Sequence, residues 1–238
     1  MSVTRDSPDR EVVIVDDVAS AAAERIAAAA RAGGHIALSG GSTPRKAHEK
    51  LAAMGLDWSG VEVWFGDDRA VPPDHEHSNY RMAKESLLDH VSVGAVHRIK
   101  GELGYEAAAD DYEAELRDSF GDGIPSLDLV LLGLGPDAHT ASLFPGDAAL
   151  GERERLAVGV ETPGMAPLVS RVTLTLPVLN AGKEVVFLIS GEDKAEAVAR
   201  AFGDAAGPDA PASLVRPDPG SLTLLLDPPA AARLGAAG

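Results

Sequence analysis

A histidine placed just after a predicted buried strand is the residue of this chain best suited to catalysis. Residues 127–132 form an apolar run typical of a strand buried in a parallel sheet. Gly133 and Gly135 then let the chain turn, and His139 follows beside Thr140, a possible helix start. Open α/β sheets bind their ligands at the carboxyl ends of their strands. The sequence therefore predicts an enzyme in which His139 lies at that edge.

A glycine-rich segment after another predicted strand has the composition of an anion-binding turn. Residues 39–44 read Ser-Gly-Gly-Ser-Thr-Pro and lead into a predicted helix. Gly40 and Gly41 allow the backbone to approach a ligand closely. The hydroxyls of Ser42 and Thr43, with the free N–H groups of the helix start, suit a phosphate or another oxyanion. An ordinary tight turn explains the segment equally well, and it matches neither nucleotide-binding motif, Walker A or GxGxxG.

Acidic and basic residues follow a third predicted strand, in the sequence Gly-Asp-Asp-Arg-Ala-Val-Pro of residues 66–72. In a functional interpretation, Arg69 binds a substrate oxyanion and Asp67 orients either Arg69 or His139. A solvated charged turn is the alternative. The nearby Ser78 is expected to cap the helix that follows it.

Two other cations occupy positions that suit an anionic ligand. Arg171 opens an otherwise apolar strand, and Lys194 lies in the first turn of a predicted helix. A cation at that end of a helix is unfavourable unless a bound anion offsets it. Taken singly, each is equally explained as a surface cation. His75 and His77 lack a third ligand, so no metal site is predicted.

Strands alternate with helical segments along most of the chain, as in a parallel sheet with crossover helices. This pattern predicts an α/β fold: a three-layer, doubly wound, mostly parallel sheet with helices on both faces. Without repeats or a long linker, residues 1–238 are expected to form a single domain. The predicted strands are 12–15, 35–38, 61–65, 127–132, 156–160, 171–174, 185–189 and 221–226, and the predicted helices are 19–32, 44–54, 79–90, 105–119 and 193–202.

The composition excludes several classes of function. The chain has no cysteine, which rules out a thiolate nucleophile or a cysteine-ligated metal. A formal net charge of −16 argues against nucleic-acid or anionic-membrane partners. No apolar run approaches the roughly 20 residues of a membrane span, and the N-terminus lacks the features of a signal peptide. We therefore expect a cytoplasmic protein.

Taken together, these segments resemble the 6-phosphogluconolactonase family, within the glucosamine-6-phosphate isomerase-like superfamily. Four pieces match in the family's order: residues 39–44; residues 67–72 with 78–80; residues 133–146; and residues 171–173 through Lys194. The resemblance implies a modified Rossmann-like fold and hydrolysis of 6-phospho-D-glucono-1,5-lactone to 6-phospho-D-gluconate in the oxidative pentose phosphate pathway. It also implies no metal and no organic cofactor. We expect a monomer.

The resemblance assigns roles by position. His139 matches the family's general base, Arg69 an active-site arginine, and Asp67 an acid beside it. Substrate- and phosphate-binding positions are matched by Gly40, Gly41, Ser42, Thr43, Arg171 and Lys194. Two residues depart from the family's pattern: Ala138 stands where glycine is usual, and Asp68 where glutamate is common. If position 138 requires a positive φ, the alanine carries a strain of about 1 kcal/mol.

Two alternative functions differ from lactone hydrolysis in their chemistry. A glucosamine-6-phosphate deaminase would share the fold, but its motif normally continues with an acid that assists the histidine. Residues 140–145 here read Thr-Ala-Ser-Leu-Phe-Pro and lack that acid. A non-catalytic sugar-phosphate-binding regulator would need a DNA-binding segment or a partner module, and this acidic chain has no recognisable one.

Overall fold

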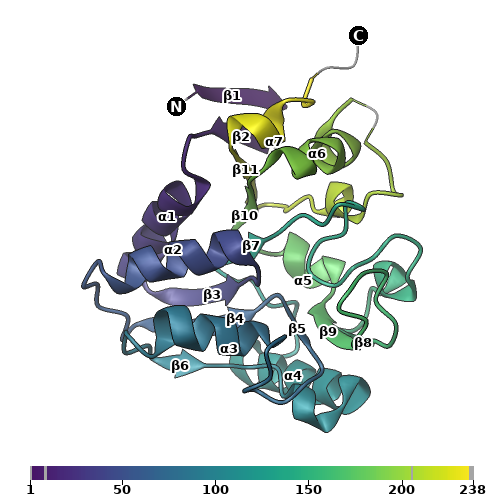
Figure 1. The fold of residues 1–238 in the computed structure, drawn as a ribbon. Coiled ribbons are helices and arrows are strands. Elements are labelled where there is room, and N and C mark those ends of the chain that lie inside the picture. Colours follow the sequence, from purple (N-terminus) through teal and green to yellow (C-terminus); the bar gives the residue numbers. More distant parts are fainter. Residues whose placement is uncertain (1, 8–9, 205, 236–238) are drawn as a thin grey trace.

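The predicted α/β architecture is confirmed by a computed structural model, which describes residues 2–7, 10–204 and 206–235. The main sheet has eight strands, and neighbouring strands pair in parallel except for the edge strand β1, which pairs antiparallel with β2 (Figure 1). Their order is β1 (Ser2–Ser7), β2 (Arg10–Ile14), β11 (Ser221–Leu226), β10 (Glu184–Ile189), β7 (Leu129–Leu132), β3 (Gly34–Leu38), β4 (Val61–Phe65) and β6 (Ala95–Val96).

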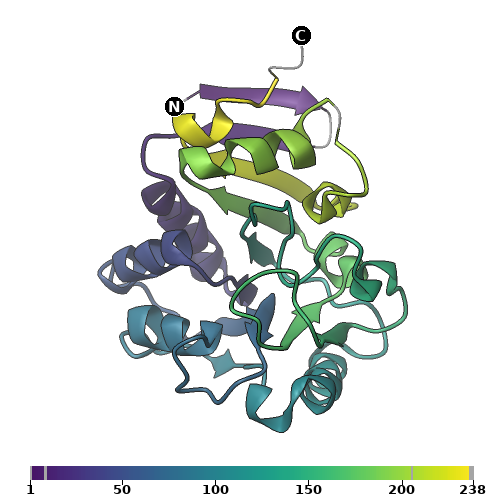
Figure 2. The ribbon, with the colours of Figure 1, turned by 45° about the vertical axis from the view of Figure 1, so that its right-hand side comes forward.

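Helices cover both faces of this sheet, as right-handed crossovers require. One group lies together on one face: α1 (Val18–Ala32), α2 (Ser42–Ala52), and α3 (Asn79–Ala83) with its π-helical continuation η1 (Lys84–Leu88) (Figures 1 and 2). The other side carries α4 (Tyr105–Phe120), α5 (Leu176–Asn180), α6 (Ala195–Phe202) and, near the end of the chain, α7 (Pro228–Ala231). None of the described helices combines the length and apolarity needed to cross a membrane.

A second, three-stranded sheet differs from the prediction. The sequence suggested residues 156–160 and 171–174 as further members of a mostly parallel sheet. Instead β8 (Ala157–Val160) and β9 (Arg171–Leu174) pair antiparallel, and β9 also pairs with the short β5 (Asp67–Arg69), which lies in a segment predicted as loop. The ten residues between β8 and β9 contain no helix, so they form a hairpin connection and not a parallel crossover.

Helix starts also shift relative to the prediction. We expected a helix from Pro44, with proline at the first position. The helix α2 begins at Ser42, because Gly41 adopts φ 112° as the N-cap and turns the chain sharply there. Likewise, Lys194 lies in a 3-10 turn, η4 (Glu192–Lys194), immediately before α6.

The packing of α2 against η1 buries a histidine outside the predicted site. The Nδ1 of His48 lies 3.1 Å from the Oγ of Ser86, whose hydroxyl donates to the backbone oxygen of Met82 at 2.7 Å. Because that proton is engaged, Nδ1 carries the imidazole proton and donates to Ser86. The Nε2 is buried and has no hydrogen-bond partner among the described residues. Burial lowers the pKa of His48 from 6.5 to about 4.

This buried imidazole makes the fold sensitive to acid. The imidazole has a pKa of 6.5 in the unfolded chain and about 4 in the folded protein, so between these values only the unfolded chain binds the proton. The free energy of unfolding therefore falls as the pH drops from about 6.5 towards 4. The full loss from this group is on the order of 3 kcal/mol. The test is to measure the free energy of unfolding of the wild type and of His48→Leu by urea titration at pH 7.5 and at pH 4.5. Relative to the wild type, we expect the variant to be more stable at pH 4.5 than it is at pH 7.5. A difference that does not depend on pH would contradict this assignment.

Candidate active site

The loops that carry the predicted site residues meet at one edge of the main sheet. Strands β7, β3 and β4 are consecutive neighbours, and all three run in the same direction. Their carboxyl ends lead into residues 133–146, residues 39–41 and β5, respectively. Parallel pairing therefore brings together segments that are far apart in the sequence.

His139 is held in a defined orientation by a carboxylate. The Oδ1 of Asp137 lies 2.5 Å from the Nδ1 of His139 and also accepts from its backbone N–H at 3.1 Å. Because a carboxylate only accepts, Nδ1 carries a proton and Nε2 is left as the basic nitrogen. Gly135 makes this possible, since a Cβ there would lie 2.0 Å from Nδ1. The ring is thus oriented to accept a proton at Nε2.

The backbone around His139 is strained. Ala138 has φ 64° and Ala141 has φ 48°, a region that non-glycine residues rarely occupy. The departure from the usual glycine at position 138 therefore carries a strain of about 1–2 kcal/mol. Thr140 does not begin a helix, contrary to expectation: its hydroxyl donates to the oxygen of Gly133 at 2.9 Å, and it forms an isolated bridge with Leu143. Strain of this kind concentrates at functional sites.

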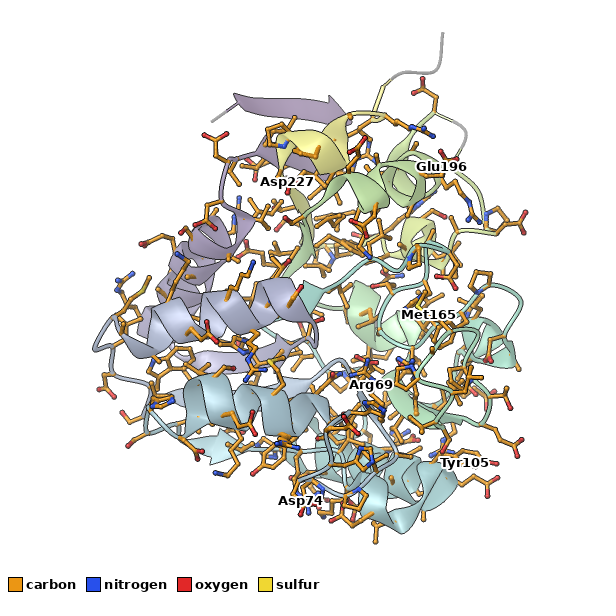
Figure 3. All side chains as sticks on the ribbon, viewed as in Figure 1. Arg69, Asp74, Tyr105, Met165, Glu196 and Asp227 are labelled. Atoms are coloured by element: carbon orange, nitrogen blue, oxygen red, sulfur yellow. The ribbon has the colours of Figure 1, made fainter. Side chains whose placement is uncertain are left out.

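The small antiparallel sheet places two arginines directly opposite each other. Arg69 on β5 pairs in register with Arg171 on β9. The Nη1 of Arg69 donates to the Oδ1 of Asn79 at 2.5 Å and to the oxygen of His77 at 3.1 Å. The Nη2 of Arg171 donates to the oxygens of Met165 and Pro167 at 3.3 and 3.4 Å. All four acceptors are uncharged. Figure 3 shows Arg69 and Met165 in the central part of the molecule.

Each of these guanidinium groups keeps an unused donor. The Nε atoms of Arg69 and Arg171 are buried without a hydrogen-bond partner, and neither residue forms an ion pair within the described part of the chain. Arg171 is only 3% exposed. Burial, and secondly the charge of Arg69, lower the pKa of Arg171. Two adjacent cations without an ion pair among the described residues have the chemistry to attract an anion.

A phenylalanine joins the arginine pair to the histidine. The ring centroid of Phe144 lies 4.5 Å from that of His139, and the Cζ of Arg171 lies 5.3 Å from the ring centroid of Phe144. The guanidinium of Arg171 thus gains a cation–π contact with this ring. The predicted base, His139, and the two predicted arginines, Arg69 and Arg171, therefore lie in one continuous group.

Among the described residues, Asp67 forms no hydrogen bond or ion pair with His139 or Arg69. Its Oδ2 accepts from the hydroxyl of Ser142 at 2.6 Å, and its Oδ1 lies 3.3 Å from the Nδ2 of Asn79. The carboxylate at the histidine is that of Asp137, which sequence reasoning missed, although its position two residues before His139 was a usable signal. Hydrogen bonds link Asp67 to Arg69 through the side chain of Asn79.

Asp68 has a structural role at the start of α3. It accepts from the backbone N–H groups of Asn79 and Tyr80 at 2.6 and 3.0 Å and from the hydroxyl of Ser78 at 3.1 Å. Burial raises the pKa of Asp68 to about 6 against the effect of these bonds. Ser78 itself caps α3, as predicted, by accepting from the N–H of Arg81 at 3.1 Å.

The remaining predicted residues lie at the same sheet edge, apart from this group. Ser42 and Thr43 occupy the first turn of α2, where no side chain caps the free N–H groups. Lys194 follows β10, the neighbour of β7, and its Nζ lies 3.8 Å from the nearest carboxylate, that of Asp193. No hydrogen bond joins Ser42, Thr43 or Lys194 to Arg171 in the described residues. Gly40 lies against Asn79, the partner of Arg69, since a Cβ on Gly40 would be 2.0 Å from the Oδ1 of Asn79.

Comparison with known proteins identifies the family. Residues 9–224 match the family described as glucosamine-6-phosphate isomerases/6-phosphogluconolactonase. The chain is 41% identical to a 6-phosphogluconolactonase of Nostoc, with 84% of each chain covered, and 42% identical to the human 6-phosphogluconolactonase, with 87% of this chain and 83% of the relative covered. It superposes on the 6-phosphogluconolactonase from Trypanosoma cruzi with a TM-score of 0.86 and 28% identity, covering 98% of this chain and 99% of that one. The chain belongs to the glucosamine-6-phosphate isomerase/6-phosphogluconolactonase family.

Proposed function

We propose that this protein is a 6-phosphogluconolactonase, which hydrolyses 6-phospho-D-glucono-1,5-lactone to 6-phospho-D-gluconate in the oxidative pentose phosphate pathway. The observation that carries the proposal is the pairing of an oriented base with an unneutralised cationic site. His139 presents Nε2 while Asp137 holds Nδ1, and the neighbouring Arg69 and Arg171 have no carboxylate partner among the described residues. The relatives named as 6-phosphogluconolactonases support the same activity.

His139 acts as the general base in this mechanism. Its Nε2 takes a proton from a water molecule as the water oxygen attacks the lactone carbonyl carbon, C1. The resulting imidazolium is stabilised by Asp137 and then returns the proton to the ring oxygen as the bond between C1 and that oxygen breaks. The products are the free carboxyl group and a hydroxyl group on the opened chain.

Cations bind the two charged regions of the substrate. We assign Arg69 to the oxyanion that develops at C1, because the neutral amide of Asn79 holds its guanidinium in a fixed orientation. We assign the phosphate to Arg171, Lys194, the hydroxyls of Ser42 and Thr43, and the backbone at Gly40 and Gly41. A bound phosphate fixes C1 against the base, so its binding energy contributes to the rate. Asp67 acts by positioning neighbouring groups.

The wider setting of the proposal follows the sequence expectations. We propose a single domain over residues 1–238, supported by one continuous apolar core among the described residues. We also propose a cytoplasmic monomer that needs neither metal nor cofactor and does not bind nucleic acid or membrane. The net charge of −16 is compatible with an anionic substrate, because the cations named above act locally.

Hydrolysis of freshly prepared lactone tests the function directly. The wild-type protein is assayed with 6-phosphogluconolactone, with spontaneous opening subtracted, and with unphosphorylated gluconolactone as the comparison substrate. We expect fast turnover that depends on the phosphate. Binding of 6-phosphogluconate without turnover would favour a sugar-phosphate-binding protein, and ammonia release from glucosamine 6-phosphate would favour a deaminase.

Lys194→Ala tests the phosphate assignment. Loss of one charge-assisted hydrogen bond to the phosphate is expected to raise KM about 10- to 100-fold, with kcat changed much less. The matched control is Lys183→Ala, which removes the same charge from a lysine paired with Asp128 at 2.7 Å, at the opposite end of β10. Steady-state kinetics of both variants decide the matter. An unchanged KM for Lys194→Ala would remove it from the phosphate site.

A further inference from the structure

Asn79 is the residue at which three segments of the site meet. It is the first residue of α3 and is buried. Its Oδ1 accepts from the Nη1 of Arg69 at 2.5 Å, and its Nδ2 donates to the backbone oxygen of Asp67 at 2.9 Å. The glycine-rich turn packs against the same amide, since a Cβ on Gly40 would lie 2.0 Å from the Oδ1. No role was predicted for Asn79 beyond the helix start.

The surrounding groups fix which way the amide faces. The Nδ2 lies between two acceptors, the backbone oxygen of Asp67 and its Oδ1 at 3.3 Å. Turning the amide over would set its oxygen against these oxygens and its N–H groups against the guanidinium of Arg69. Both contacts would be repulsive, so a single orientation is compatible with the neighbours. The backbone oxygen of Asp67, together with its carboxylate, therefore orients Asn79, and Asn79 orients Arg69.

The same chain of contacts continues to the loop that carries the base. The Oδ2 of Asp67 accepts from the hydroxyl of Ser142 at 2.6 Å, three residues beyond His139. The backbone N–H of Ser142 in turn donates to the Oγ1 of Thr173 on β9 at 3.2 Å. Buried hydrogen bonds thus connect the Arg69 guanidinium, through Asn79 and Asp67, to the loop that carries His139.

The chemical type of residue 79 controls the charge at the site. Asn79 and the backbone oxygen of His77 are the acceptors for Arg69, and both are neutral. An aspartate of the same size would form an ion pair with Arg69 and cancel the charge that attracts the substrate. We propose that Asn79 is a positioning residue for catalysis: it fixes the guanidinium of Arg69 through a neutral amide, so that Arg69 keeps its orientation without an ion pair to residue 79. This inference deepens the proposed function and rests on it.

A double-mutant cycle between Asn79 and Arg69 tests the inference. We expect Asn79→Ala alone to lower kcat/KM about 10- to 100-fold. In an Arg69→Met background the same substitution is expected to cost less than about twofold, because its effect acts through the missing guanidinium. Equal losses in the two backgrounds would overturn the proposal, since a merely structural role does not depend on Arg69.

Two further variants test whether the effect at position 79 arises from the neutral amide that holds Arg69 or from the stability of α3. Asn79→Asp keeps the size of the side chain and is expected to lower kcat/KM at least as much as Asn79→Ala. Ser78→Ala removes the cap of α3 without touching Arg69, and is expected to lower Tm while kcat and KM stay within about twofold. Full activity in Asn79→Asp, or a Ser78→Ala loss equal to that of Asn79→Ala, would contradict the proposal.

A binding measurement keeps this test independent of lactone hydrolysis. Calorimetric titration with 6-phosphogluconate is performed on the same four members of the cycle. If the wild type binds but does not hydrolyse the lactone, the proposed function fails, and the coupling between Asn79 and Arg69 is read from affinity alone. Additive losses of affinity would then overturn the positioning role.

Discussion

We expect His139→Ala to lower kcat for 6-phosphogluconolactone by about 10²- to 10⁴-fold, while KM changes less than about threefold. The reason is the geometry of the ring: Asp137 takes the Nδ1 proton, so Nε2 is the basic atom available to water. The substrate is bound mainly by cations on other elements, which the substitution leaves in place. Initial rates from a pH-stat or a coupled assay, corrected for spontaneous hydrolysis, give both constants.

His90→Ala is the matched control for this substitution. His90 is exposed and lies two residues after the end of η1, and its Nε2 is 3.0 Å from the backbone oxygen of Glu85. Its loss removes an imidazole without touching the His139 loop, so kcat and KM are expected to stay within about twofold. A kcat near the wild-type value in His139→Ala would exclude the histidine as the base.

The second large effect is expected for Arg69→Met, which should lower kcat/KM about 10²- to 10³-fold. The substitution keeps an apolar side chain of similar length but removes the only charge that Asn79 orients. Arg171, directly opposite on β9, remains but is held by backbone oxygens and the Phe144 ring, so it does not replace the lost donor. The readout is kcat/KM at low substrate concentration.

Arg117→Met provides the comparison for loss of an arginine. Arg117 pairs with Glu113 on α4, and Glu113 keeps Arg155 as a second partner at 2.6 Å. The net charge changes by the same amount in the two variants, so a general electrostatic effect would lower both rates. Equal losses in Arg69→Met and Arg117→Met would refute a specific role for Arg69.

Local patterns in the sequence predicted six of the eight strands of the main sheet, all except β1 and β6, and placed His139 after one of them. The apolar run before Gly133 predicted a buried strand, and the structure has β7 there with all four residues buried. Because strands alternate with helices, the carboxyl ends of the parallel strands had to meet at one edge, and this placed His139 with the glycine-rich turn. Such signals depend on nearest neighbours along the chain, so they survive without tertiary information.

The identity of the groups that touch each other was decided only by tertiary structure. The sequence by itself determined the α/β order and the position of His139 at a strand end. It did not determine that Asp67 to Arg69 pairs with the strand opening at Arg171, a hundred residues later, because strand register depends on packing between distant segments. That register sets the two arginines side by side. The buried polar contacts then assign Asp137 to the histidine and Asp67 to Asn79, since most buried polar groups are paired with a partner within hydrogen-bond reach.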